Sequence, residues 1–289
     1  MKKHIFIKVY LITMAFSIMS CANVENNKDY INEKGKLFII GGGHRPDSLM
    51  IRMFEEAAFK NDDYAIVLPM SSSVPDSAII WAKEQFHRIG IENVSGFNFL
   101  HGLENYDAAQ IDSLKNASLI YISGGDQNRF MSIVKDTEIE TAIHHAWNDG
   151  AMIAGTSAGA AVMSEKMITG DEKKHAEYRS TPRIVEVDNI ELAGGLGFLK
   201  SSIVDQHFVW RSRYNRLLSL VIEYPDIIGI GIDESTAIIV EGDSAEVVGR
   251  SQVVVFRNPD NSKIIKEGKL GAKNLIIDLY LPGEKFSIN

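Results

Sequence analysis

The sequence predicts an α/β fold in which a mainly parallel sheet is covered by helices on both faces. Two observations lead to this class. From residue 36 onward, short apolar runs typical of buried strands alternate with segments of helical spacing, and several of the apolar runs end in glycine. With 45% hydrophobic residues overall, residues 36–289 are long enough to bury one sizeable core, so we expect a single domain there.

The first half of this domain supplies the expected parallel strands and their helices. Strands are predicted at 37–40, 64–69, 94–100, 118–123 and 151–154, and helices at 48–59, 77–89, 108–115, 128–149 and 158–163. Active sites of such sheets lie beyond the carboxyl ends of the strands. We therefore expect the strand-end segments 41–43, 71–73 and 124–127 to converge with Ser157.

The second half is richer in strands. Strands are predicted at 202–204, 227–232, 236–240, 245–256 and 275–281, with a turn at 258–261. We interpret the last two, 245–256 and 275–281, as an antiparallel extension of the sheet.

Ser157 is the candidate nucleophile. It stands between Gly155 and Gly159, where a predicted strand gives way to a helix. The glycines allow a turn too tight for side chains, so the hydroxyl projects from the strand end and the first helical amides point at its target. Small residues also occupy such turns for packing alone. Assigning Ser157 as a nucleophile therefore needs a candidate base and a candidate acid as well.

His207 is the candidate base among eight histidines, because it directly follows a predicted strand and precedes a basic, helix-like stretch. His144 and His145 fall within a predicted helix, and His44 follows the glycine run 41–43, where it could line the site or lie at its rim.

The acid is expected from the adjacent carboxylates Asp233 and Glu234, which lie between two apolar strands. Either could orient His207, although a solvated turn is the alternative interpretation. The resulting order of serine, histidine and acid differs from the serine, acid, histidine order of α/β-hydrolases, which excludes that fold.

Arg211, Arg213 and Arg216 follow the candidate base in an otherwise acidic protein. The planar guanidinium suits carboxylate recognition, so we expect one or two of them to bind substrate. The alternative is a solvated helix face.

The N-terminus predicts export. Residues 1–20 combine Lys2, Lys3 and Lys8 with an apolar stretch, which is typical of a signal peptide. Cys21, the sole cysteine of the sequence, follows as in a bacterial lipobox, so residues 21–35 would form the tether of a membrane-anchored lipoprotein of the cell envelope. An uncleaved anchor or an ordinary signal peptide is the alternative. No disulfide can form within the chain.

Composition and motifs exclude other functions. The net charge of −8 argues against nucleic acid as a partner, and losing the lysine-bearing leader makes the chain still more acidic. GxGxxG, GxxxxGK[ST], HExxH and CxxC are all absent, so we expect no nucleotide, other cofactor or metal.

Four motifs in order resemble the cyanophycinases, serine peptidases of family S51. They are Gly124–Gln127, Gly155–Ala160, Asp205–Phe208 with the three arginines after it, and Gly229–Glu234. The resemblance covers residue 36 to the C-terminus. It implies the flavodoxin-like three-layer fold that this family shares with class I glutamine amidotransferases and aspartyl dipeptidases.

The resemblance also implies roles for individual residues. Ser157, His207 and Glu234 match the nucleophile, base and orienting acid, and Gly125 and Ala158 match the residues whose amides form the oxyanion hole. Substrate-binding positions match Gln127, Asp205, Gln206, Arg211, Arg213 and Arg216. Whether Asp233 shares the role of Glu234 stays open.

The implied substrate is cyanophycin, a poly-aspartate backbone with arginine on each β-carboxyl, cut into β-Asp-Arg dipeptides. A homodimer is implied as well. Two departures from the family, the long segment around 171–175 and the lipoprotein-like N-terminus, leave the exact substrate open.

Two alternatives to a cyanophycinase stay open. One is an aspartyl or β-aspartyl dipeptidase of the same family, and the other is a non-catalytic surface binding module. An amidotransferase is excluded, because its turn needs a cysteine where this chain has Ser157.

Overall fold

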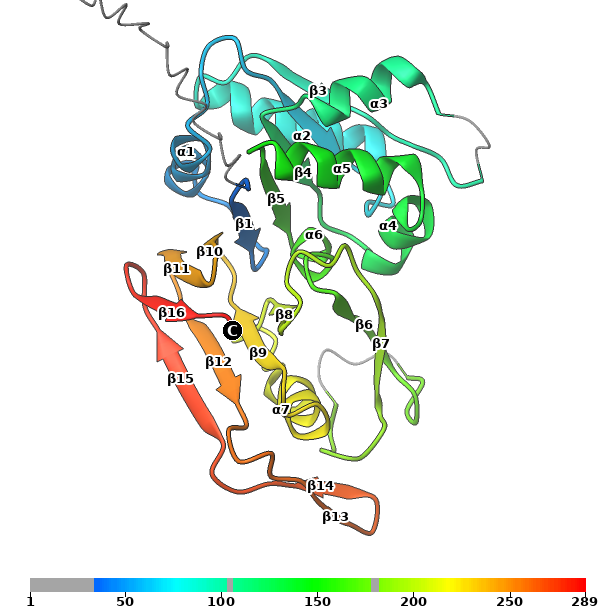
Figure 1. The fold of residues 1–289 in the computed structure, drawn as a ribbon, viewed down its shortest axis with the longest axis vertical. Helices are drawn as coiled ribbons and strands as arrows, with labels where there is room; N and C mark the ends of the chain where they lie inside the picture. The colour runs from blue at the N-terminus through cyan, green and yellow to red at the C-terminus, as the bar shows by residue number, and fades with distance from the viewer. Residues whose placement is uncertain (1–33, 103–105, 178–181) are drawn as a thin grey trace, which may run out of the picture. The chain divides into compact units, whose positions relative to one another are not determined.

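The fold was obtained as a computed structural model that describes residues 34–102, 106–177 and 182–289 (Figure 1). These residues belong to one compact unit. The predicted signal peptide, Cys21 and nearly all of the tether lie outside the described residues.

An eight-stranded sheet forms the centre of this unit. Its parallel part has the order β1 (Leu37–Ile40), β5 (Met152–Thr156), β4 (Leu119–Ile122), β2 (Ala65–Leu68) and β3 (Val94–Gly96). Antiparallel strands β10 (Thr236–Glu241), β11 (Ser244–Gly249) and β16 (Lys285–Ser287) continue the sheet beyond β1. This arrangement confirms the predicted α/β class with its mainly parallel sheet.

Side chains of the parallel strands alternate between two apolar layers. In β1, Phe38 and Ile40 pack on the face that also buries apolar residues of α1 (Asp47–Glu56) and α2 (Pro75–Arg88). Leu37 and Ile39 pack on the opposite face with residues of α3 (Ala108–Lys115), α4 (Gln127–Val134) and α5 (Glu138–Asn148). Each such fully buried side chain contributes about 1.5–3 kcal/mol to folding, so burial on both faces of the sheet stabilises the three-layer arrangement.

A second, four-stranded sheet has the order β15 (Ile276–Tyr280), β12 (Val253–Arg257), β9 (Ile228–Ile232) and β8 (Ser202–Gln206). Strands β8 and β9 run parallel, and helix α7 (Tyr214–Glu223) packs on this sheet. The C-terminal strands thus divide between two sheets, whereas we expected one extension. Gly231 allows Phe208 to pack closely on β9, since a Cβ at this position would lie 2.3 Å from the ring of Phe208.

Two small hairpins and one short helix complete the described elements. β6 (Lys166–Glu172) pairs with β7 (Ile190–Gly194), and β13 (Ile264–Lys266) pairs with β14 (Lys269–Gly271). Helix α6 (Ala158–Ala161) has only one turn.

Two predicted elements differ from the observed ones. The predicted helix 128–149 is divided into α4 and α5, because Asp136 adopts a left-handed φ of 59° and Thr137 caps the second helix by accepting a hydrogen bond from the Ile139 amide. The predicted strand 94–100 is shorter in the structure and ends at Gly96, the last residue that pairs with β2.

In the described part of the chain, no helix combines the length and apolar character needed to cross a bilayer. The same residues contain no group of three or more His, Cys, Asp or Glu side chains placed to hold a metal ion.

Candidate active site

Ser157 lies at the corner between β5 and α6, with φ 54° and ψ −109°. The neighbouring glycines are required here: a Cβ at Gly155 would lie 2.2 Å from the Gly159 carbonyl oxygen, and one at Gly159 would lie 2.3 Å from that of Ile122. The half-buried serine is therefore held in a strained conformation by a tightly packed corner.

His207 lies beside this serine, with 2.9 Å between its Nε2 and the serine Oγ. It follows the carboxyl end of β8 and also has a left-handed φ, 51°. Its amide donates to the Gly41 carbonyl at 2.7 Å, and a Cβ on Gly42 would lie 2.5 Å from its Cε1. The glycine run after β1 thus forms the wall against which the imidazole rests.

Glu234 completes a chain of hydrogen bonds. Its Oε1 accepts from His207 Nδ1 at 2.6 Å, so Nε2 faces the serine. Glu234 lies where the chain passes from β9 of the second sheet to β10 of the first. The site therefore forms where the two sheets meet, with the serine from one sheet and the histidine from the other.

Asp233 has different partners. It is buried, and its two carboxylate oxygens accept hydrogen bonds from the Trp210 amide at 2.8 Å and from Ser251 Oγ at 2.6 Å. Asp233 therefore fixes the turn after His207, and Glu234 alone of the two acids contacts the imidazole.

The environment favours a neutral His207. Burial is the main cause that lowers its pKa, the hydrogen bond to Glu234 acts in the opposite direction, and the positive charge of Arg211 lowers the pKa further. A neutral imidazole near neutral pH is the form that can accept a proton from a serine hydroxyl.

Gly125 lies in the turn after β4 and lines a cavity together with Ser157, and Ala158 directly follows Ser157. Gly125 has φ 142°, and a Cβ there would lie 2.1 Å from the Ser71 carbonyl oxygen. Within residues 34–102, 106–177 and 182–289, neither amide donates a hydrogen bond. Within these residues both amides thus keep a free donor, which is the kind of group that can stabilise an oxyanion.

A cavity of about 320 Å³ lies next to Ser157. Its charged and amide-bearing lining residues are Asp126, Gln127, Asn128, Asp171, Gln206, Arg211, Arg213 and Arg216. We name this space the arginine cavity. All three predicted arginines line it, together with two carboxylates.

The arginines differ in their pairing. Arg216 binds the Asp205 carboxylate through two nitrogens, with 2.6 Å from Nε to Oδ2, and Arg213 donates to the Gln206 carbonyl at 2.8 Å. Asp205 is 1% exposed, so it lies beneath these arginines and holds them in place. The half-buried Arg211 makes no ion pair with any described residue, which leaves its charge available to a ligand.

Gln127 is likewise held by the protein. Its Nε2 donates to the carbonyls of Ile168 and Thr169 at 2.9 and 2.7 Å, which ties the start of α4 to β6. His44 is exposed and does not line the arginine cavity, and its carbonyl accepts a hydrogen bond from Ser235 Oγ at 2.6 Å.

Sequence reasoning missed two parts of this site. Asp171 was noted only as part of a long segment, because its position in a separate hairpin gives no local signal. The convergence of segment 41–43 with Ser157 was predicted, but the contact of Gly42 with the imidazole was not.

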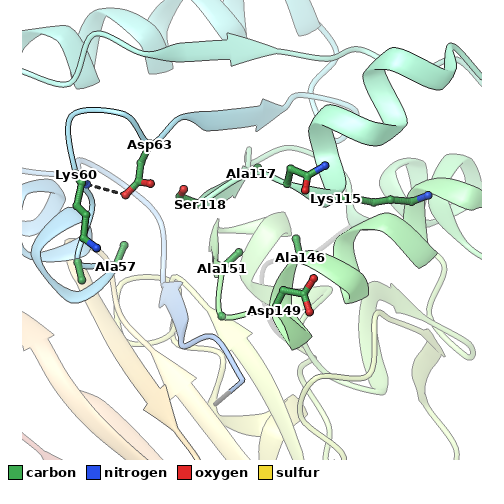
Figure 2. A pocket seen from close by; sticks show the side chains of 12 residues that line it. Ala57, Lys60, Asp63, Lys115, Ala117, Ser118, Ala146, Asp149 and Ala151 are labelled. Atoms are coloured by element: carbon green, nitrogen blue, oxygen red, sulfur yellow. Dashed lines mark hydrogen bonds between the residues drawn. The ribbon is translucent and has the colours of Figure 1, made fainter. Parts of the chain in front are cut away.

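A larger cavity of about 490 Å³ lies at the other end of the parallel strands (Figure 2). Ser118 and Ala151 line it just before β4 and β5 begin, and the Lys60 amide donates to Asp63 at its edge. It contains none of the predicted site residues. Ligands of parallel α/β sheets bind at the carboxyl ends, so the geometry favours the site at Ser157.

Comparisons with known proteins find relatives of one peptidase family. The family model of peptidase family S51 matches residues 37–248. A cyanophycinase from Nostoc sp. is 32% identical over 270 residues, which cover 88% of this chain and 86% of the relative. A cyanophycinase from Synechococcus elongatus is 34% identical over 236 residues, covering 79% and 70%.

The solved structures include a similar fold. The crystal structure of a peptidase from an acI-B1 actinobacterium superimposes with a TM-score of 0.66 at 22% identity, covering 89% of this chain and 98% of that one. At this identity the likeness concerns the fold.

Proposed function

The chain belongs to peptidase family S51, and we propose that it is a serine-type exopeptidase that hydrolyses cyanophycin to β-Asp-Arg dipeptides. The observation that carries this proposal is the continuous path from Ser157 Oγ through His207 to Glu234, with hydrogen bonds of 2.9 and 2.6 Å.

In the proposed reaction, His207 Nε2 takes the proton of Ser157 as Oγ attacks the scissile carbonyl carbon. Glu234 stabilises the imidazolium that forms. The tetrahedral intermediate collapses when the same imidazolium gives its proton to the leaving nitrogen, which releases the amine and leaves an acyl-serine. His207 then takes a proton from water, whose oxygen attacks the acyl carbon, and the proton returns to Ser157 as the acid product leaves.

The amides of Gly125 and Ala158 are the proposed oxyanion donors. Each donor of this kind contributes about 3 kcal/mol to transition-state stabilisation, so the pair would matter as much as the charged groups.

The arginine cavity would hold the acyl side of the substrate. Arg211, which makes no ion pair with any described residue, offers its guanidinium to a carboxylate, and the exposed Asp171 offers a carboxylate to a guanidinium. A β-linked arginine carries both charges, so this combination supports an aspartyl-arginine substrate. Arg213, Arg216 and Gln206 would shape the cavity floor.

The test is product identification. The purified protein is incubated with cyanophycin and with a panel of α- and β-aspartyl dipeptides, and the products are identified by mass spectrometry. Release of β-Asp-Arg from the polymer supports the proposal. Cleavage of dipeptides alone would assign an aspartyl dipeptidase, and binding without cleavage would assign a binding module.

We also propose that the enzyme is exported and anchored through a lipid on Cys21, as the lysine-bearing start and apolar stretch of residues 1–20 indicate. Metabolic labelling with a palmitate analogue in a bacterial host tests this. The native protein should carry the label and sediment with membranes, and Cys21→Ser should do neither. Equal labelling of both would contradict the proposal.

A further inference from the structure

A second cavity, of about 230 Å³, also reaches Ser157. Among its lining residues are Arg45, Trp81, Tyr121, Thr156 and His207, and we name it the Arg45 cavity. Ser157 is the sole lining residue that it shares with the arginine cavity. The nucleophile therefore stands between two separate spaces of different character.

The position of His207 distinguishes the roles of the two spaces. His207 lines the Arg45 cavity and not the arginine cavity, whereas Gly125 lines the arginine cavity. In acyl transfer, the imidazolium gives its proton to the leaving nitrogen, which must lie within hydrogen-bond reach of Nε2. The part of a substrate that carries the leaving nitrogen consequently extends into the cavity that the imidazole lines.

Arg45 supplies the charge in this cavity. Its Nε donates to Gln85 Oε1 at 3.2 Å, and Gln85 Nε2 donates back to the Arg45 carbonyl at 2.7 Å. Gln85 is only 7% exposed, so it anchors the arginine from a fixed position. The two terminal nitrogens of Arg45 make no hydrogen bond or ion pair with any described residue. They are therefore available to bind a carboxylate in the bidentate geometry that a guanidinium favours.

The rest of the wall is partly apolar. Trp81 of α2 lines this cavity and is 58% exposed, so its ring is accessible to a ligand. The hydroxyls of Tyr121 and Thr156 are buried and interact with each other, so Arg45 is the polar group of this wall that can bind a charged ligand.

We propose that the Arg45 cavity is the leaving-group subsite of the peptidase, and that Arg45 binds a carboxylate on the residue whose amine is released. This assignment rests on the proposed function. A substrate whose leaving residue has a free carboxyl group is bound between Arg45 and the proton donor His207, with Trp81 covering its side chain. The subsite thus selects the carboxylate-bearing end of a chain, which is the behaviour of an exopeptidase.

The test uses two substrates that share one acyl residue, β-Asp-Arg, and differ in the leaving residue, which is either aspartate with a free α-carboxyl group or its α-carboxamide. The native protein should cleave the acid with a kcat/KM about tenfold to hundredfold above that of the amide. Arg45→Gln keeps a partner for Gln85 and should lose most of this preference, because its kcat/KM falls far more on the acid than on the amide. Equal losses on both substrates, or an unchanged preference, would overturn the assignment.

A matched control is Arg88→Gln, which removes an exposed arginine paired with Asp47 at 2.8 Å and should leave the preference intact. Binding separates this proposal from the proposed function. The released amine product is titrated into Ser157→Ala and into Ser157→Ala with Arg45→Gln by calorimetry. If the native protein cleaves neither substrate, the proposed function fails. A tenfold weaker binding in the double variant still supports the subsite, and equal binding overturns it.

Discussion

Glu234 Oε1 lies 2.6 Å from Nδ1 of His207, whereas its neighbour Asp233 accepts hydrogen bonds from the Trp210 amide and from Ser251 Oγ. Two adjacent carboxylates therefore have separate tasks: one orients the imidazole, and the other holds the backbone that carries it.

This division predicts different effects for two matched substitutions. Glu234→Gln removes the negative charge beside the imidazolium and the acceptor that sets its tautomer, so kcat should fall about a thousandfold or more. Asp233→Asn keeps an acceptor for the Trp210 amide and should reduce kcat far less. Steady-state kinetics of both variants tests this, and equal losses would contradict the assignment.

The pH dependence of kcat/KM should follow the pKa of His207, which burial lowers from the ordinary value of 6.5. The neutral imidazole is the active form, so activity is present above this pKa and is lost as the pH falls through it. The midpoint should lie below 6.5. Arg211→Ala should raise the midpoint, because the arginine lowers the pKa, and Glu234→Gln should lower it. A midpoint that neither change moves would exclude His207 as the titrating base.

Substitutions of Arg216 and Arg211 are predicted to change the free energy of unfolding by different amounts. Arg216→Ala leaves the carboxylate of Asp205 buried without its main partner, which should lower the free energy of unfolding by about 3–5 kcal/mol. Arg211→Ala removes an arginine that pairs with no acid among the described residues, so it should change stability little, while KM for an aspartyl-arginine substrate rises about tenfold. Urea unfolding and kinetics on the same samples distinguish the two effects.

Gly42 should be needed for activity through its contact with the imidazole. Gly42→Ala places a Cβ 2.5 Å from His207 Cε1 and should displace the ring, which lowers kcat about a hundredfold. Gly90→Ala is the control, since Gly90 also has a positive φ, 87°, and its Cβ would meet nothing within 4 Å. A similar kcat for both variants would contradict the role assigned to the contact between Gly42 and the imidazole.

The parallel part of the fold was predictable from sequence, because apolar runs such as Leu37–Ile40 and Leu119–Ile122 are buried on both faces. The second sheet was not, since the pairing of β9 with β8 and β12 depends on contacts between distant segments. The break at Asp136 was also missed, because a left-handed residue within a helical pattern leaves no periodic signal.

Within the site, the glycines around Ser157 gave a strong local signal. The position of Asp205 did not follow from sequence, because its burial beneath Arg216 depends on the packing of α7 against β8. Arg45 and Trp81 were not singled out for the same reason: they come from the β1–α1 turn and from α2, and only the tertiary fold brings them to the serine.

The central claim is that Ser157 is the nucleophile activated by His207. The most direct measurement is mass spectrometry of the protein after treatment with a fluorophosphonate, with hydrolysis followed in parallel. We expect one adduct, located on Ser157, that accumulates as activity is lost. Ser157→Ala should form no adduct, and His207→Ala should form it much more slowly than the native protein. Full activity in a protein labelled at Ser157, or undiminished hydrolysis by Ser157→Ala, would contradict the account.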